Sequence, residues 1–73
     1  MKSTFINSVD DMSWLFDTHL KENKEFYPEY NSAILYGNED CPEKIELYKK
    51  KNPLVGDFFV LFSLMDDKYV LTN

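Results

Sequence analysis

The spacing of apolar residues changes along the chain, and each spacing predicts a different kind of element. Residues 9–24 place apolar side chains at intervals of three and four, which is typical of one face of a helix. The inward face of this segment would consist of Val9, Met12, Leu15, Phe16, His19 and Leu20. Ser8, followed by Asp11 three residues later, favours a helix start at this point. We therefore expect an N-terminal helix over residues 9–24.

Two short apolar segments flank this helix and its following loop. Residues 4–6 predict a short strand, and residues 33–36, ended by Gly37 and Asn38, predict a strand or an extended packing segment. Between them, Pro28 argues against a helix through residues 25–31, because proline lacks the N–H that a helix interior needs.

A second helix is expected to begin at Pro42, whose fixed φ suits the first helical position. Asp40 and Glu43 would lie near its positive end, and the lysines at 49–51 near its negative end. Ile45 with Leu47 or Tyr48 would face the sheet.

The C-terminal third predicts a β-hairpin made of residues 54–65 and 69–72, with a turn around 66–68. Along its first strand the side chains alternate between two faces. Phe58, Val60, Phe62 and Leu64 share one face, and Phe59, Leu61, Ser63 and Met65 share the other. Both faces are apolar, so each needs a cover.

Together these elements predict a single α+β domain over residues 1–73. We expect a small antiparallel sheet that ends in the C-terminal β-hairpin and carries two helices on one face. The second face has two possible covers. A homodimer would bury it through Phe59, Leu61 and Met65, whereas in a monomer the N-terminal segment and the aromatic loop at 26–30 would complete the cover.

Length and composition agree with one small folded domain. The chain has 73 residues, of which 44% are hydrophobic and 16% aromatic, too many for a disordered segment. A single cysteine excludes an internal disulfide and fits a reducing compartment. The start of the chain lacks the apolar core of a signal peptide, and no apolar run approaches the ~20 residues of a membrane span. We therefore expect a cytoplasmic protein.

The net charge of the chain argues against nucleic acid as a direct partner. Thirteen acidic residues oppose eight lysines, no arginine occurs, and the net charge is -5. Direct binding to nucleic acid is not expected, because that polyanion is normally neutralised by lysine and arginine.

The inventory for catalysis is thin. His19 is the single histidine, and its place on the apolar side of a helix favours a packed residue over a general base. Cys41 has no second cysteine for a zinc or redox motif. Gly37 and Gly56 are isolated, which excludes a phosphate-binding loop, and Asp66 with Asp67 favours a turn over a calcium loop. We expect no catalytic residue, no metal and no cofactor.

The acidic residues fall into two groups that could serve as a binding surface. The candidate partner-binding residues are Asp10, Asp11, Trp14, Asp17 and Glu22 in the first helix, and Glu39, Asp40, Glu43 and Glu46 around the start of the second. On helices, carboxylates three or four residues apart lie about 5–6 Å from one another, close to the spacing of DNA phosphates. The alternative is a solvated face, with Trp14 covering a neighbouring element rather than anchoring a partner.

In length, acidity, absence of arginine and abundance of lysine and aromatic residues, the chain resembles the small early proteins with which phages of low-GC bacteria disable host machinery. Within that group it is most similar to phage inhibitors of the bacterial DNA sliding clamp. The resemblance covers the overall character of the whole chain and transfers no functional residue. It implies a non-enzymatic DNA mimic whose carboxylates occupy the place of DNA phosphates in a host DNA-binding protein and block replication.

Other functions remain open at this point. The target could instead be RNA polymerase, a CRISPR nuclease or uracil-DNA glycosylase. A different class is a protein–protein adaptor or antitoxin-like module that binds through the apolar strand faces, with charge serving solubility alone. A small enzyme would require His19 or Cys41 to act chemically.

Overall fold

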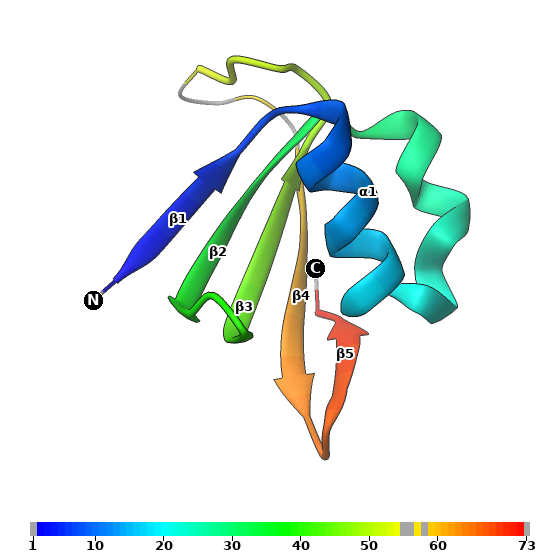
Figure 1. Cartoon of the computed structure of the whole chain (residues 1–73), viewed down its shortest axis with the longest axis vertical. Helices are drawn as coiled ribbons and strands as arrows, with labels where there is room; N and C mark the ends of the chain where they lie inside the picture. Colours follow the sequence, from blue (N-terminus) through cyan, green and yellow to red (C-terminus); the bar gives the residue numbers. More distant parts are fainter. Residues whose placement is uncertain (1, 55–56, 58, 73) are drawn as a thin grey trace.

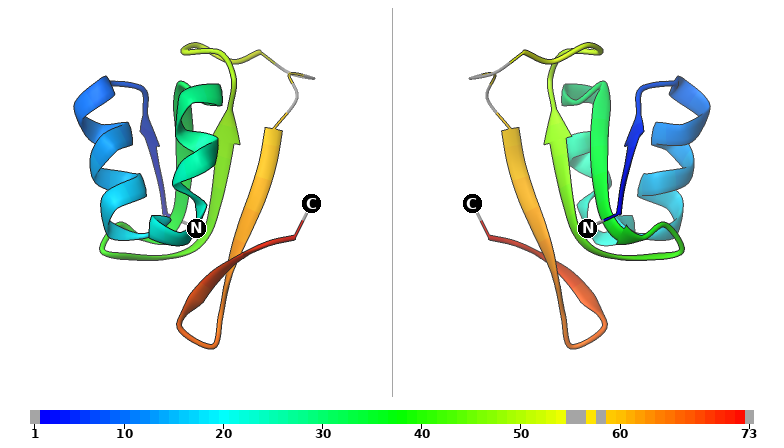
Figure 2. Two further views of the ribbon diagram at one scale, coloured as in Figure 1. Left: turned by 90° about the vertical axis from the view of Figure 1, so that its right-hand side faces the viewer. Right: turned by 90° about the vertical axis from the view of Figure 1, so that its left-hand side faces the viewer.

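The chain folds into a five-stranded antiparallel sheet with two helices packed on one of its faces (Figures 1 and 2). The computed structural model describes residues 2–54, 57 and 59–72. Within these residues the strands are β1 (Ser3–Ile6), β2 (Ser32–Asn38), β3 (Cys41–Tyr48), β4 (Phe59–Met65) and β5 (Lys68–Leu71), and the helices are α1 (Val9–Thr18) and the 3-10 helix η1 (Lys21–Glu29). The strands lie side by side in sequence order. The predicted α+β class, antiparallel sheet and C-terminal hairpin are confirmed.

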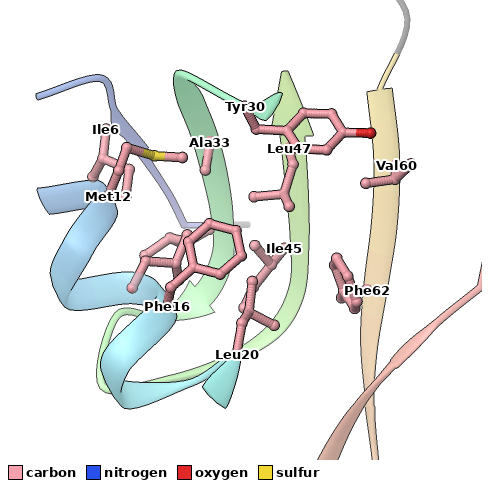
Figure 3. Close-up of a cluster of buried hydrophobic side chains, with 12 residues drawn as sticks. Ile6, Met12, Phe16, Leu20, Tyr30, Ala33, Ile45, Leu47, Val60 and Phe62 are labelled. Carbon is pink, nitrogen blue, oxygen red and sulfur yellow. The ribbon is translucent and has the colours of Figure 1, made fainter. Parts of the chain in front are cut away.

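Helix α1 begins where the sequence predicts. The backbone N–H of Asp11 donates to the Ser8 hydroxyl at 3.0 Å, so Ser8 caps the helix. Met12, Leu15 and Phe16 are buried, as their spacing predicts, but Val9 is 76% exposed. The prediction for Val9 was wrong because Ile6, at the end of β1, occupies the space beside Met12 at the first turn (Figure 3).

The chain leaves the α-helical path after Thr18, so the predicted extent to residue 24 was wrong. The N–H groups of His19 and Leu20 both donate to the Leu15 carbonyl, and Leu20 turns into the core. Helix η1 then runs back along α1, and the Tyr27 hydroxyl donates to the Val9 carbonyl at 3.2 Å. Burial of Leu20 and of the aromatic residues of η1 against one core favours this reversal over a straight helix.

Residues 25–31 also differ from the prediction, because η1 continues to Glu29 with Pro28 inside it. Pro28 lies near the end of a short 3-10 helix, where the absence of one N–H removes a single hydrogen bond. The ring of Tyr27 stacks on that of Phe16, with centroids 5.2 Å apart, and Phe26 meets Phe62 at 6.1 Å.

The second helix predicted at Pro42 is instead strand β3, at the centre of the sheet. Ile45 and Leu47 are fully buried while Lys44 and Glu46 alternate with them, which is the two-residue period of a strand. The Pro42 carbonyl accepts a hydrogen bond from the Tyr69 hydroxyl at 2.7 Å, and pairing with β4 begins only at Lys44. The backbone groups of Pro42 therefore point away from β2, and its missing N–H interrupts no ladder.

The core lies between the helices and one face of the sheet, here called the helix face (Figure 3). The buried residues are Ile6, Met12, Leu15, Phe16, Leu20, Tyr30, Ala33, Leu35, Ile45, Leu47, Val60 and Phe62. Cross-strand rows define the face: Leu35, Ile45 and Phe62 stand opposite one another, as do Ala33, Leu47 and Val60. Leu64 and Tyr69, also on this face, lie at its edge and are half-buried.

The hairpin β4–β5 turns at Asp66 and Asp67, whose φ angles are 52° and 65°. Two central residues with positive φ characterise the type I′ turn, which suits the twist of paired strands. The predicted alternation along β4 is confirmed, with Val60 and Phe62 on the helix face. Phe58 lies outside the described residues, and Leu54, predicted to open this strand, lies outside it, since β4 begins at Phe59. Within the described part of the chain, no helix combines the length and apolar character needed to cross a membrane.

Candidate functional site

No helix or strand of the described residues packs on the face of the sheet opposite the helices, and we call it the open face. Two rows of cross-strand neighbours fix most of its membership: Phe5, Ile34, Glu46 and Leu61 form one row, and Ser3, Tyr36, Lys44, Ser63 and Val70 form the next. Ser32, Tyr48 and Phe59 at one end and Met65 with Lys68 at the other complete it, and Ser32 alone is fully buried among them, with its hydroxyl donating to the Lys50 carbonyl at 2.6 Å. The predicted interface residues Phe59, Leu61 and Met65 therefore share one face.

Neither segment proposed for an intramolecular cover reaches the open face. The N-terminal segment is β1, which joins the sheet at its edge, and residues 26–30 lie on the helix face with α1 (Figure 2). Phe5 is consequently 47% exposed and Met65 55% exposed. Along β4 the expectation of two largely apolar faces is thus confirmed, while the cover predicted for a monomer is contradicted for the described part of the chain.

A carboxylate held by two phenols lies at the centre of the open face. One oxygen of Glu46, Oε1, accepts hydrogen bonds from the hydroxyls of Tyr36 at 2.7 Å and Tyr48 at 2.9 Å. Burial, followed by the hydrogen bond to Glu46, raises the pKa of Tyr48 to about 12, whereas for Tyr36 the hydrogen bond is the first cause of a raised pKa. Both phenols thus remain protonated donors at neutral pH.

Aromatic contacts extend this network. The Lys44 ammonium lies 4.9 Å from the centre of the Tyr36 ring, and the rings of Tyr48 and Phe59 are 5.5 Å apart. Sequence analysis did not identify Tyr36 or Tyr48 as site residues. Tyr48 lies two residues from Glu46, which becomes a signal only when 41–48 is recognised as a strand, and Tyr36 comes beside Lys44 only through the pairing of β2 with β3.

The predicted acidic surface is divided among several places. Asp10 and Asp11 lie in the first turn of α1. Asp17 is paired with Lys24 at 2.6 Å and accepts a hydrogen bond from Ser13, and the contacts with Lys24 are the first causes of its lowered pKa. Glu46 lies on the open face. The helical spacing expected for the second acidic group was wrong because these residues occupy a turn and a strand.

One end of the molecule does gather acids from separate segments. The β2–β3 and β4–β5 turns lie at the same end, beside the start of η1 (Figure 1). We call this the hairpin end; its exposed acids are Glu22, Glu39, Asp40, Asp66 and Asp67. The ion pairs among the described residues join Lys24 to Asp17 and Lys50 to Asp57, and neither involves these carboxylates. Sequence analysis assigned Asp66 and Asp67 only to a turn and missed them here.

Glu43 adds a negative charge near this end. It is the extra residue of a β-bulge, since Tyr36 pairs with Lys44 and Gly37 pairs with Pro42. Gly37 has a φ of 91°, and a Cβ on it would lie 3.2 Å from Cγ of Glu43. The bulge therefore depends on glycine at position 37.

Trp14 is 37% exposed, so it is neither fully buried nor free of the fold. The centroids of the Trp14 and His19 rings lie 5.3 Å apart in a T-shaped arrangement, and those of the His19 and Tyr69 rings lie 5.5 Å apart. Trp14 thus contacts a neighbouring side chain, as expected for a covering residue, and its role as an anchor for a partner stays a prediction.

A cavity of about 320 Å³ lies at the hairpin end, between the C-terminus of α1 and the β4–β5 turn. His19, Cys41 and Tyr69 are among its lining residues. Burial lowers the pKa of His19, which keeps the imidazole neutral at pH 7, and raises the pKa of Tyr69 to about 12. Among the described residues, no group of three or more histidine, cysteine or acidic side chains is arranged to hold a metal ion.

Comparison of the chain with protein-family models, with curated proteins and with solved structures found no match. The function must therefore be argued from the chain's own charge distribution and surfaces.

Proposed function

We propose that the chain is a non-enzymatic inhibitor that binds a DNA-binding protein of a host cell and occupies the DNA site of that protein. The best candidate for the target is the DNA polymerase sliding clamp of a low-GC bacterium, on the character-level resemblance described above. In this proposal the protein acts in the bacterial cytoplasm and its effect is to block DNA replication.

The observation that carries the proposal is the group of exposed acids at the hairpin end. Glu22, Glu39, Asp40, Asp66 and Asp67 come from three separate segments and are brought together by the fold. Since no lysine in the described residues forms an ion pair with them, their charge is available to a cationic partner. A DNA channel lined with lysine and arginine is such a partner, and long-range attraction would speed the encounter.

Trp14 and the acids of α1 are further candidates for contact with the partner, and Asp10 and Asp11 lie in the first turn of α1, at the other end of that helix from the hairpin end. Asp10 and Asp11 are exposed, and Trp14 offers the partly exposed aromatic group that is common at binding hot spots. Asp17 contributes less than its position in the sequence suggests, because Lys24 already pairs with it.

The proposal includes a homodimer formed through the open face, with Phe59, Leu61 and Met65 at its centre. Support comes from the partly exposed apolar side chains there, on which no helix or strand of the described residues packs. A pair of chains would carry twice -5, or -10, which strengthens attraction to a basic channel.

The test is binding to purified sliding clamp by calorimetry or surface plasmon resonance. We expect affinity to fall at least about tenfold between about 0.05 M and about 0.5 M salt, and duplex DNA to compete. A Glu39→Gln/Asp40→Asn variant should bind about tenfold more weakly, while Glu25→Gln/Glu29→Gln, which removes equal charge from η1, should bind normally. Salt-independent binding, or equal losses in both variants, would contradict the DNA-mimic proposal.

A second candidate function is a protein–protein adaptor or antitoxin-like module, and the uncovered open face favours it. In that case a Leu61→Asp change would abolish partner binding while the acid variants leave it unchanged. Inhibition of RNA polymerase, a CRISPR nuclease or uracil-DNA glycosylase differs from the main proposal only in the target, which the same binding assay distinguishes.

The proposal assigns no catalysis to His19 or Cys41. Both line the cavity at the hairpin end, so the alternative is directly testable. A His19→Ala/Cys41→Ala variant that keeps full inhibition in a replication assay agrees with the proposal, and loss of inhibition in a folded variant with normal clamp binding contradicts it.

A further inference from the structure

The charged residues of the open face are arranged in a way that suits a second copy of the same chain. In the strand register, the charged positions on this face are Lys44, Glu46 and Lys68. The face thus carries one acid of the chain's thirteen, together with two lysines. Two chains that each carry a net charge of -5 repel one another over most of their surfaces. This repulsion is expected to be weakest between two open faces, because few acids lie there.

Lys44 and Glu46 lie two residues apart on β3, the middle strand of the sheet, and point to the same side. Within the described residues they do not pair with each other, because the Lys44 ammonium lies over the Tyr36 ring. Both hydrogen bonds to Glu46 are accepted by Oε1, and no described residue donates to Oε2. One carboxylate oxygen and one ammonium therefore remain available near the centre of the face.

In a twofold-symmetric interface, if residue i of one chain contacts residue j of its partner, then j also contacts i. An axis that passes through the open face between Lys44 and Glu46 would bring each lysine to the glutamate of the other chain. Such an arrangement forms two ion pairs on a face that also presents the apolar side chains of Phe59 and Leu61.

We infer that a second copy of the chain covers the open face, and that reciprocal Lys44–Glu46 ion pairs fix the register of the two sheets. Tyr36 and Tyr48 are positioning residues in this arrangement, since their hydroxyls hold the Glu46 carboxylate in place before association. The inference rests on the homodimer of the proposed function and adds the contacts that orient it.

The test is a charge exchange followed by sedimentation equilibrium. Lys44→Glu and Glu46→Lys should each weaken the dimer by at least about tenfold, because each places like charges opposite one another twice. The double variant Lys44→Glu/Glu46→Lys restores opposite charges and should recover most of the affinity. Glu46→Gln keeps an acceptor for both tyrosines but removes the charge, and should show an intermediate loss.

Two controls separate this effect from net charge and from folding. Lys51→Glu and Glu22→Lys make the same charge changes away from the open face and should leave the dimer constant within about threefold. Far-UV circular dichroism and thermal unfolding at low protein concentration identify any variant that fails to fold. Failure of the double variant to recover, with its fold intact, overturns the register.

The same measurements distinguish failure of the register from failure of the homodimer. If Leu61→Asp dissociates the wild-type dimer while the single charge variants do not, the homodimer stands and the Lys44–Glu46 register is overturned. If the wild-type chain is monomeric at all concentrations, both are overturned. Clamp binding by the acids of the hairpin end is measured in a separate assay, so failure of clamp binding is distinguishable from failure of the dimer or of its register.

Discussion

Glu46 serves two roles at once, because its two carboxylate oxygens face different surroundings. Oε1 accepts hydrogen bonds from Tyr36 on β2 and Tyr48 on β3, which lie on the same face to either side of Glu46. These charge-assisted hydrogen bonds are stronger than those between neutral groups, so they hold the side chain in one orientation. The result is a carboxylate at the centre of an otherwise largely apolar surface.

The raised pKa of Tyr48 predicts a loss of stability at high pH. Its pKa is about 12 in the folded chain, against 10.0 ordinarily, with burial as the first cause. The unfolded chain therefore loses this proton first, and the stabilisation is complete below pH 10 and lost as the pH rises through about 12. In urea titrations, the free energy of unfolding should fall more steeply over this range for wild type than for Tyr48→Phe. Equal slopes would contradict the assignment, since lysine deprotonation affects both proteins alike.

At the scale of elements, the two hairpin turns use different devices. The β2–β3 turn contains an Asn38 side chain that accepts from the Asp40 N–H at 2.8 Å and is followed by the Glu43 bulge. The β4–β5 turn instead places Asp66 and Asp67 at positive φ, a conformation that glycine adopts freely but that residues with a Cβ adopt at a steric cost. The acids of the two turns at the hairpin end therefore belong to turns of unequal intrinsic stability.

This difference predicts opposite outcomes for the same substitution. Asp67→Gly should stabilise the fold by about 0.5–1 kcal/mol, because glycine adopts positive φ without steric cost. Asp40→Gly removes the same charge from the other turn, where φ is not positive, and should give no such gain. Thermal unfolding of the two variants at neutral pH makes the comparison. A stabilisation by Asp40→Gly as large as that by Asp67→Gly would show that relief of charge repulsion, rather than backbone conformation, is responsible.

At the scale of the whole molecule, one core supports the entire fold. Twelve buried apolar residues form a single cluster among the described residues, and they come from α1, from the two positions that flank η1 and from four of the strands. A domain of 73 residues has a total stability of roughly 4–11 kcal/mol. One large side chain at the centre of this cluster therefore accounts for a large share of the total.

We expect Phe62→Ala, at a fully buried position, to cost about 3–5 kcal/mol and leave much of the chain unfolded at 37 °C. Val9→Ala, at a position 76% exposed, should change stability by less than about 0.5 kcal/mol. Urea titration followed by circular dichroism measures both. A large effect of Val9→Ala would indicate that the side chain is covered in solution, for example by another protein molecule.

The sequence by itself determined the local features of this protein. Ser8 caps α1 because its hydroxyl reaches an N–H three residues away, and the alternation along β4 follows from the two-residue period of any strand. Charge balance and the absence of a second cysteine or histidine are also properties of the sequence alone.

Tertiary structure decided the segments whose local preferences were ambiguous. Residues 41–48 carry helix-start signals, but burial of Ile45 and Leu47 between β2 and β4 outweighs them, because packing in a central strand stabilises more than a cap or a dipole. Because residues 41–48 form a strand rather than a helix, the predicted acidic face does not form. For the same reason Glu46 lies within hydrogen-bond distance of Tyr36 and Tyr48. Contacts between residues distant in sequence also bring the two turns together at the hairpin end. They place both helices on the other side of the sheet from the open face, so that no described helix packs on it. Neither feature follows from a local pattern.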